Sequence, residues 1–244
     1  MDAQLLAVKM IRRLREVGVL AAIREALMHL RSHESHIDEF DMKHGTDTCG
    51  SQRLWRLRIS STNARFGRAY QPTGEEELME ALNYLGVDLQ TFTFIDLGCG
   101  KGKTLLVASS LGFKQAIGVE FAGELVAIAQ ENIRKLGINN AAAICGDAAD
   151  FNFPAGNIVV YLFNPFTQEV MRKVIANLKE VNCRNLYVVY KVASCAELFD
   201  GCGFLSRLDL IPVRTSLKIW QGINDNVKYP VALVEKSEGS NRRY

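Results

Sequence analysis

Two patterns of apolar and polar positions alternate along the chain between residue 72 and residue 191. Short apolar runs fit buried strands, and the stretches between them place an apolar residue every three to four positions, as amphipathic helices do. In the first of these stretches, Thr73 followed by Glu76 has the spacing of a capping box. The alternation predicts a mostly parallel sheet covered by helices on both faces. Strands are predicted at 92–96, 115–120, 141–145, 158–163 and 185–191, and helices at 73–85, 103–111, 123–136 and 168–180.

The end of the chain has a different pattern. After a short helix near 196–199, two strand-like runs at 216–221 and 231–235 flank a polar turn, which predicts an antiparallel hairpin. Together with the five earlier strands, the hairpin predicts an α/β fold with a doubly wound, mostly parallel seven-stranded sheet. Residues 237–244 are expected to form a disordered tail.

The first 71 residues precede this alternation and are predicted to form an N-terminal helical extension. Residues 1–31 carry an apolar stripe at helical spacing, which predicts amphipathic helices packed on the main domain. The alternative is weak contact of this basic, amphipathic stretch with a membrane surface or a partner. Residues 33–71 are polar and rich in turn formers, so we expect a long loop that covers a functional site. The predicted division is an extension at 1–71, an α/β domain at 72–236 and a tail at 237–244.

Composition narrows the class of protein without identifying a partner. Apolar residues make up 48% and charged residues 23% of the 244 residues, as in an ordinary globular protein. A formal net charge of +2 is too small to favour nucleic-acid binding. The six cysteines include no C-x-x-C pair, so neither a zinc site nor a disulfide framework is expected. No signal peptide or transmembrane segment is evident, so a cytoplasmic location is expected.

A glycine-rich turn, Asp96-Leu97-Gly98-Cys99-Gly100-Lys101-Gly102, joins the first predicted strand to the next helix. Such a turn can hold a ligand against backbone N–H groups, and glycine lets the ligand approach closely. A phosphate-binding loop would need a glycine at Leu97, and a dinucleotide-binding turn would need one at Lys103, so the spacing disfavours both without excluding NAD. Glu120 ends the second strand, where a carboxylate can accept hydrogen bonds from the ribose hydroxyls of an adenosine.

This pattern resembles the first motifs of the class I methyltransferases, which use S-adenosylmethionine. The resemblance runs from about residue 70 to residue 235 and includes Cys145-Gly146-Asp147 after the third strand and Asn164-Pro165-Phe166 after the fourth. It implies a Rossmann-like fold and S-adenosylmethionine as the cofactor, with Asp147 facing the adenine amino group and Ala148 beside the ring. The resemblance places the following residues at the cofactor: Tyr70, Thr73, Asp96, Gly98, Gly100, Gly102, Glu120, Phe121, Asp147, Ala148 and Asn164.

More narrowly, the chain is similar to little-characterised bacterial methyltransferases and shows some similarity to the non-SET lysine methyltransferases. This similarity rests on a stretch from Phe40 to Thr48 and on Tyr70-Gln71-Pro72-Thr73. In those lysine methyltransferases, related segments close over the methionine end of the cofactor. The resemblance therefore implies that Tyr70 and Thr73 reach the cofactor's carboxylate, with the role of helix cap as an equal alternative for Thr73.

The acceptor side is expected at Asn164, Pro165 and Phe166, because open α/β sheets bind ligands beyond the carboxyl ends of their strands. These catalytic candidates resemble the Asn-Pro-Pro-Tyr motif of amino-group methyltransferases but lack its second proline. An asparagine carbonyl can accept a hydrogen bond from an amino group and orient its lone pair. A turn that merely ends the strand is the alternative.

The predicted function is methyl transfer from S-adenosylmethionine to an amine nitrogen of a protein lysine or another amine, without a metal. A small-molecule O-methyltransferase and a cofactor-binding regulatory protein without turnover are the alternatives. The expected partner is a methyl acceptor, either a protein or a small molecule. A nucleic-acid acceptor is disfavoured because no basic and aromatic reading module is evident.

Overall fold

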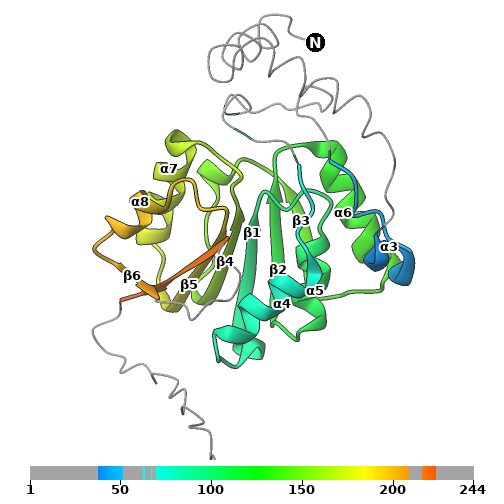
Figure 1. Ribbon diagram of the computed structural model, residues 1–244, viewed down its shortest axis with the longest axis horizontal. Coiled ribbons are helices and arrows are strands. Elements are labelled where there is room, and N and C mark those ends of the chain that lie inside the picture. Colours follow the sequence, from blue (N-terminus) through cyan, green and yellow to red (C-terminus); the bar gives the residue numbers. More distant parts are fainter. Residues whose placement is uncertain (1–37, 52–62, 64–66, 68–69, 209–215, 224–244) are drawn as a thin grey trace, which may run out of the picture.

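The computed structural model describes residues 38–51, 63, 67, 70–208 and 216–223. A seven-stranded sheet runs through the centre of the described part, and helices cover both of its faces (Figure 1). The strands are β1 (Phe92–Leu97), β2 (Gln115–Glu120), β3 (Ala141–Cys145), β4 (Gly156–Phe163), β5 (Cys183–Lys191), β6 (Leu205–Leu208) and β7 (Leu217–Gly222).

The strand order is β3-β2-β1-β4-β5-β7-β6, and it places β1 beside both β2 and β4. Strands β1 to β5 are parallel, whereas β7 is antiparallel to both β5 and β6. The chain moves outward from β1 to β3 and then returns to add β4 on the other side of β1. The carboxyl ends of β1 and β4 therefore form a topological switch point, where α/β sheets of this kind bind ligands.

The helices divide between the two faces of the sheet. Helices α4 (Glu75–Tyr84), α5 (Lys103–Ser110) and α6 (Gly123–Lys135) pack on one face, and α7 (Gln168–Lys179) and α8 (Ala196–Asp200) pack on the other. The short helix α3 (Glu39–His44) lies beside α6 (Figure 1). Two 3-10 helices, η3 (Leu89–Thr91) and η4 (Ala148–Asp150), precede β1 and β4.

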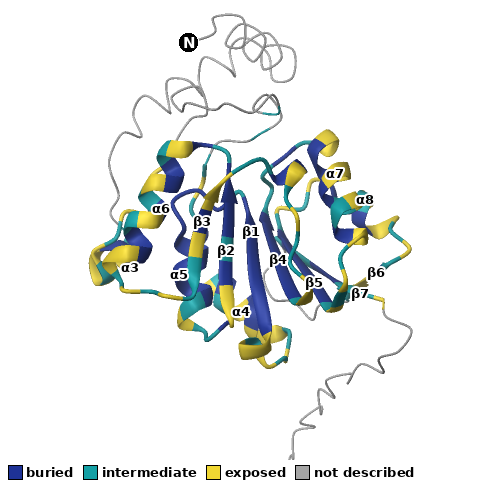
Figure 2. Ribbon diagram, turned by 180° about the vertical axis from the view of Figure 1, so that it is seen from behind, coloured by how far each residue is buried: buried dark blue, intermediate teal, exposed yellow. Residues whose placement is uncertain are grey.

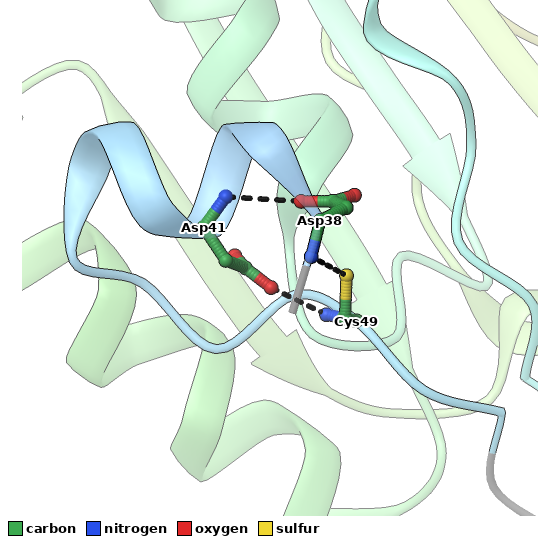
Figure 3. A group of neighbouring side chains, drawn as sticks. All are labelled: Asp38, Asp41 and Cys49. Atoms are coloured by element: carbon green, nitrogen blue, oxygen red, sulfur yellow. Dashed lines mark hydrogen bonds between the residues drawn. The ribbon is translucent and has the colours of Figure 1, made fainter. Parts of the chain in front are cut away.

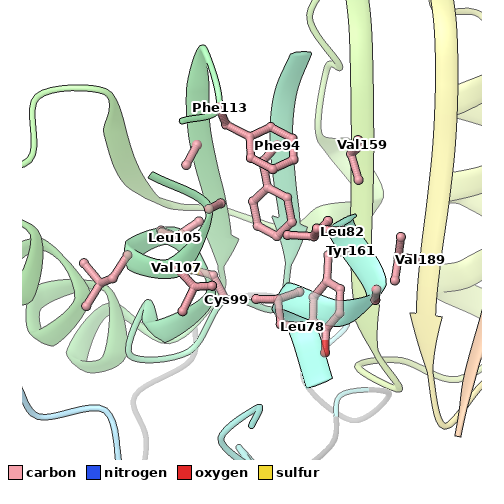
Figure 4. Close-up of a cluster of buried hydrophobic side chains, with 14 of the residues drawn as sticks. Leu78, Leu82, Phe94, Cys99, Leu105, Val107, Phe113, Val159, Tyr161 and Val189 are labelled. Carbon is pink, nitrogen blue, oxygen red and sulfur yellow. The ribbon is translucent and has the colours of Figure 1, made fainter. Parts of the chain in front are cut away.

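Aromatic side chains fill both layers between the sheet and its helices. On the α4–α6 face, the Phe94 ring lies 5.4 Å from the Phe113 ring and 6.2 Å from the Tyr161 ring (Figure 4). On the other face, the Phe199 ring lies 5.0 Å from the Trp220 ring. The central strands are buried on both faces, while the helices expose their outer sides (Figure 2). This double burial explains why β1 and β4 are almost continuous apolar runs in the sequence.

The structure confirms the predicted fold class, and the first five strands and the helices α4–α8 fall at their predicted places. The predicted hairpin needs a correction, because β7 pairs with β6 at 205–208, a strand that the sequence pattern did not predict. The predicted strand at 231–235 lies outside the described residues, as do the predicted helices at 1–31 and the tail. The division of the chain at residues 71 and 236 stays a prediction.

A second correction concerns the start of α4. Gly74 is its N-cap and contributes no side-chain hydrogen bond, so the predicted capping box at Thr73 is wrong. The Thr73 side chain is instead buried, and its hydroxyl lies 3.1 Å from the Tyr161 hydroxyl in a hydrogen bond. None of the helices in the described ranges is both long enough and apolar enough to cross a membrane.

Candidate active site

The glycine turn between β1 and α5 forms the floor of the candidate site. Gly98, Gly100 and Gly102 all have positive φ angles, of 95°, 54° and 83°. A Cβ atom on Gly98 would lie 2.9 Å from Cβ of Pro165, and one on Gly100 would lie 2.1 Å from the Tyr70 ring. Both approaches require glycine, because a side chain at either position would collide with its neighbour. The turn thus brings Tyr70 and Pro165 to the same place.

Two acidic residues end the adjacent strands β1 and β2, and both are buried. Asp96 accepts a hydrogen bond from the Thr104 hydroxyl of α5. Burial raises the pKa of the Asp96 carboxyl to about 7; the Thr104 hydrogen bond opposes this shift, and the nearby Glu120 charge adds to it. At neutral pH this carboxyl therefore lies close to the midpoint of its titration.

Glu120 is oriented by the backbone of the glycine turn and of the following loop. Its Oε2 atom accepts a hydrogen bond from the Gly100 N–H at 3.1 Å, and its Oε1 atom accepts one from the Ala122 N–H at 3.0 Å. Burial raises the pKa of Glu120, while these backbone donors favour its charged form. The Phe121 N–H also acts on this carboxylate, and about four acceptor sites leave room for a further hydrogen bond. Ribose hydroxyl groups fit that requirement.

Asp147 and Ala148 line a small hollow after β3, together with Asn63, Phe121 and Phe166. The Asp147 carboxylate accepts hydrogen bonds from the Ala149 N–H at 2.9 Å and from the Asn63 side-chain amide at 2.8 Å. Asp147 is therefore the cap of η4 and also a wall of the hollow. The contact of Asn63 was not predicted, because Asn63 lies in a polar stretch with no local motif.

The main cavity lies between this hollow and a second small hollow, and it has a volume of about 170 Å³. Phe121 and Phe166 line both the cavity and the hollow at Asp147, whereas Tyr70, Gln71 and Gly98 line both the cavity and the second hollow. The three spaces thus adjoin one another along the carboxyl ends of the strands, and together they are called the crevice below. All the predicted site residues line it except two, Gly100 and Gly102, which shape the turn.

The far side of the main cavity is formed by the ends of β4 and β5. Asn164 follows β4 and Val192 follows β5, and both have positive φ angles, of 42° and 50°. Such angles are uncommon for residues other than glycine and are costly for a β-branched residue such as valine. The Ser194 hydroxyl donates a hydrogen bond to Oδ1 of Asn164 at 2.5 Å. Val192 and Ser194 were not predicted, since nothing in their local sequence indicates that they reach Asn164.

Residues 38–51 pack against the glycine turn from outside the sheet. Nζ of Lys101 lies 2.5 Å from Oδ1 of Asp47, and Nζ of Lys103 lies 2.5 Å from Oδ2 of Asp38. The Tyr70 hydroxyl donates a hydrogen bond to the Thr48 carbonyl at 2.6 Å. The segment and Tyr70 therefore form one hydrogen-bonded wall beside the turn, and the role of residues 33–71 as a cover stays a prediction.

Asp38, Asp41 and Cys49 come together within this segment, with their oxygen and sulfur atoms within 4.8 Å of one another (Figure 3). The Asp41 carboxylate accepts hydrogen bonds from the Thr48 N–H and hydroxyl and from the Cys49 N–H. Burial and the hydrogen bond to Asp38 raise the pKa of the Cys49 thiol to about 12, so it stays protonated at neutral pH. This cluster is explained as a hydrogen-bonded turn that holds the segment together.

Comparisons with known proteins agree with this geometry. Residues 94–183 match the model of a family described as a methyltransferase domain. An "uncharacterized RNA methyltransferase" from Clostridium acetobutylicum is 29% identical over 132 residues, which cover 54% of this chain and 27% of that protein. The chain thus spans about a quarter of the length of this curated relative.

Two solved structures share the fold. A "putative methylase" from Haemophilus influenzae has a TM-score of 0.50 at 20% identity, over 62% of this chain and 99% of that one. A "putative methyltransferase" from Escherichia coli also has a TM-score of 0.50, at 19% identity, over 68% of this chain and 97% of that one. At these identities the likeness concerns the fold.

Residues 94–183 therefore match a methyltransferase domain, and the described residues have the Rossmann-like fold of such domains. The cofactor of methyltransferase domains of this kind is S-adenosylmethionine, as the sequence analysis predicted. The residues present fit this group, because Gly98 and Gly100 leave the turn without side chains and the buried Glu120 carboxylate faces the cavity. The narrower similarity to lysine methyltransferases stays a prediction.

Proposed function

We propose that this protein transfers the methyl group of S-adenosylmethionine to the nitrogen of an amine. The observation that carries the proposal is that Asn164 lines the same cavity as Gly98 and Glu120. The side chain suited to orient an amine therefore shares one space with the residues suited to hold the cofactor. The cofactor assignment rests on the family match, whereas the nature of the acceptor rests on Asn164.

The cofactor would supply an electrophilic methyl group, so the chain's own residues need only align the acceptor and exclude water. The acceptor reacts as the neutral amine, which gives up its ammonium proton to solvent before the transfer. Oδ1 of Asn164 accepts one hydrogen bond from Ser194 and keeps a second lone pair. An amine N–H group that donates to this lone pair would have its own nitrogen lone pair fixed in direction. Asn164 would thus position the nucleophile without taking a proton from it.

The aromatic residues of the crevice suit the exclusion of water. Phe121, Phe163 and Phe166 all line the main cavity, and Phe166 is buried. Phe166 also forms a β-bridge with Gly67, which ties the loop after β4 to the segment before α4. Pro165 lies against Gly98 of the glycine turn. This packing fixes the distance between the acceptor side and the cofactor side.

RNA is the second candidate for the acceptor, and the name of the Clostridium acetobutylicum relative favours it. An amino group on a nucleobase offers the same N–H donor to Asn164 as an alkyl amine does. Methylation of a small-molecule oxygen and cofactor binding without turnover are the remaining alternatives. A cytoplasmic location stays a prediction.

The test is methyl transfer from radiolabelled S-adenosylmethionine into an extract of cells that lack the protein, followed by separation of protein, RNA and small molecules. We expect label in one fraction, in a form that mild alkali does not release, because N-methyl groups withstand treatment that cleaves methyl esters. An incubation without the protein provides the background. Label released by alkali would contradict the nitrogen acceptor, and the absence of transfer by a protein that binds the cofactor would indicate a regulatory role.

A further inference from the structure

The second hollow of the crevice contains two residues of opposite charge. Its wall includes Tyr70, Thr73, Asp96 and Lys103. Among the described residues that line it, Asp96 has the only carboxyl group and Lys103 the only amino group. We propose that Lys103 binds the carboxylate at the methionine end of S-adenosylmethionine. The proposal rests on the assignment of S-adenosylmethionine as the cofactor, and it makes Lys103 the charged partner of the carboxylate that the sequence analysis assigned to Tyr70 and Thr73.

The hydroxyl groups of Tyr70 and Thr73 are already engaged. Tyr70 donates its single O–H to the Thr48 carbonyl, and the Thr73 hydroxyl shares a hydrogen bond with the Tyr161 hydroxyl. A carboxylate has no proton and needs donors. Tyr70 would have to give up its present bond to serve a carboxylate. Thr73 keeps its own O–H for a carboxylate where Tyr161 donates the shared bond, but a neutral hydroxyl supplies no charge.

Lys103 has donors to spare. An ammonium group carries three N–H donors, and Asp38 accepts one of them at 2.5 Å. The Lys103 side chain is only 6% exposed, whereas that of Asp38 is 35% exposed. The ammonium is therefore buried beside Asp38 and the Phe40 ring, on a side chain that lines the hollow, so a second anion within its reach would gain from a charge that water screens poorly.

The charges of the hollow match the methionine end of the cofactor, which carries one carboxylate and one ammonium group. Lys103 is the first residue of α5, so the positive end of the helix dipole adds to its charge. Asp96 provides the opposite charge for the ammonium group. A ligand with both groups thus meets a complementary pair of side chains.

Lys101 offers a matched control. Lys101 and Lys103 are each 5% exposed, and both pair with an aspartate of the 38–51 segment. Lys101 differs in that it lines neither the main cavity nor the two hollows described above. Loss of either lysine loosens the segment, but only the loss of Lys103 should remove a contact with the carboxylate.

The test is calorimetric binding of two nucleosides to the wild type, Lys103→Met and Lys101→Met. S-Adenosylhomocysteine carries the carboxylate and the ammonium group, and methylthioadenosine carries neither. We expect Lys103→Met to weaken the binding of S-adenosylhomocysteine roughly tenfold or more, since a charge-assisted contact is lost. The affinity for methylthioadenosine should change less than about twofold. Lys101→Met should change the affinities for both nucleosides by the same factor.

An equal loss for both nucleosides in Lys103→Met would overturn the proposal, because Lys103 would then act only through the segment. Unchanged binding of both would overturn it as well. If Lys103→Met does not fold, Lys103→Gln replaces it, and the affinities for the two nucleosides are compared in the same way. Lys103→Arg keeps the charge and should keep the wild-type ratio of the two affinities. If the wild type binds neither nucleoside, the assignment of the cofactor is refuted, and not only the role of Lys103.

Discussion

The cofactor side and the acceptor side of the crevice are built in different ways. On the cofactor side, Asp96 and Glu120 are buried, and hydroxyl and backbone donors hold their carboxylates. On the acceptor side, Asn164 and Val192 have left-handed backbone conformations, and the Asn164 carboxamide is bonded to an exposed serine, Ser194. One side is stabilised by satisfied buried groups, and on the other side Val192 is held against its conformational preference, whereas asparagine tolerates this conformation.

This difference indicates how the two sides would respond to mutation. When a buried acceptor loses a hydrogen-bond donor or a ligand contact, a desolvated polar group remains without a partner. Substitutions on the cofactor side should therefore change the affinity for the cofactor. A left-handed residue other than glycine costs on the order of 1–3 kcal/mol and persists where the surrounding structure requires it. Changes on the acceptor side should therefore appear in the rate of transfer and, in one case, as a gain in stability.

The largest expected effect is that of Asn164→Ala on methyl transfer. Alanine cannot accept the amine hydrogen bond, so transfer to the acceptor found by labelling should fall by roughly 10², while affinity for S-adenosylhomocysteine stays within about twofold. Asn164→Asp keeps an oxygen acceptor and should retain part of the rate. Wild-type transfer by a folded alanine variant would show that Asn164 only ends the strand.

Glu120→Ala should have the opposite phenotype. The variant loses a carboxylate that can accept the ribose hydroxyls, so calorimetry should show binding of S-adenosylhomocysteine weakened at least tenfold, or roughly 1.4 kcal/mol. Asn164→Ala is the control, because it alters the same cavity without removing a cofactor contact of this kind. Equal affinity of Glu120→Ala and the wild type, with both proteins folded, would remove the distinction between the two sides.

The sequence predicts the fold well where each strand buries both faces. β1 and β4 are almost continuous apolar runs, and this pattern depends only on neighbouring residues. β6 is the exception, since it has four residues, of which Ser206 and Arg207 are exposed. So short and polar a strand has no recognisable period, and its pairing with β7 is a tertiary contact.

The site residues also fall into two groups: those that a local motif reveals, and those that contact residues far away in the sequence. The glycine turn and its acids are recognisable because the motif is contiguous. The contacts of Ser194 with Asn164, of Lys103 with Asp38 and of Asn63 with Asp147 join residues 30, 65 and 84 positions apart. Thr73 fits a local capping pattern, yet a bond to a residue 88 positions away determines its role. Pattern reasoning cannot weigh such contacts.

A smaller effect concerns the pH dependence of binding. Only ionised Asp96 can pair with the cofactor's ammonium group, and the pKa of Asp96 is about 7 in the structure. Affinity for S-adenosylhomocysteine should therefore increase as the pH rises through 7, by roughly fourfold between pH 6.5 and pH 8. Methylthioadenosine, which lacks the ammonium group, should show no such increase. Identical profiles for the two nucleosides in calorimetry would show that Asp96 does not meet this group.

The smallest expected effect is a gain in stability from Val192→Gly. Relief of the left-handed strain should outweigh the added backbone entropy of glycine, because the Val192 side chain is 47% exposed and buries little surface. Unfolding in urea should show a net gain of about 0.5 kcal/mol over Val192→Ala, which keeps Cβ and hence the strain. No gain over alanine would mean that the surroundings do not hold Val192 against its preference. A gain accompanied by slower transfer would indicate that the end of β5 gives up stability to shape the acceptor side of the cavity.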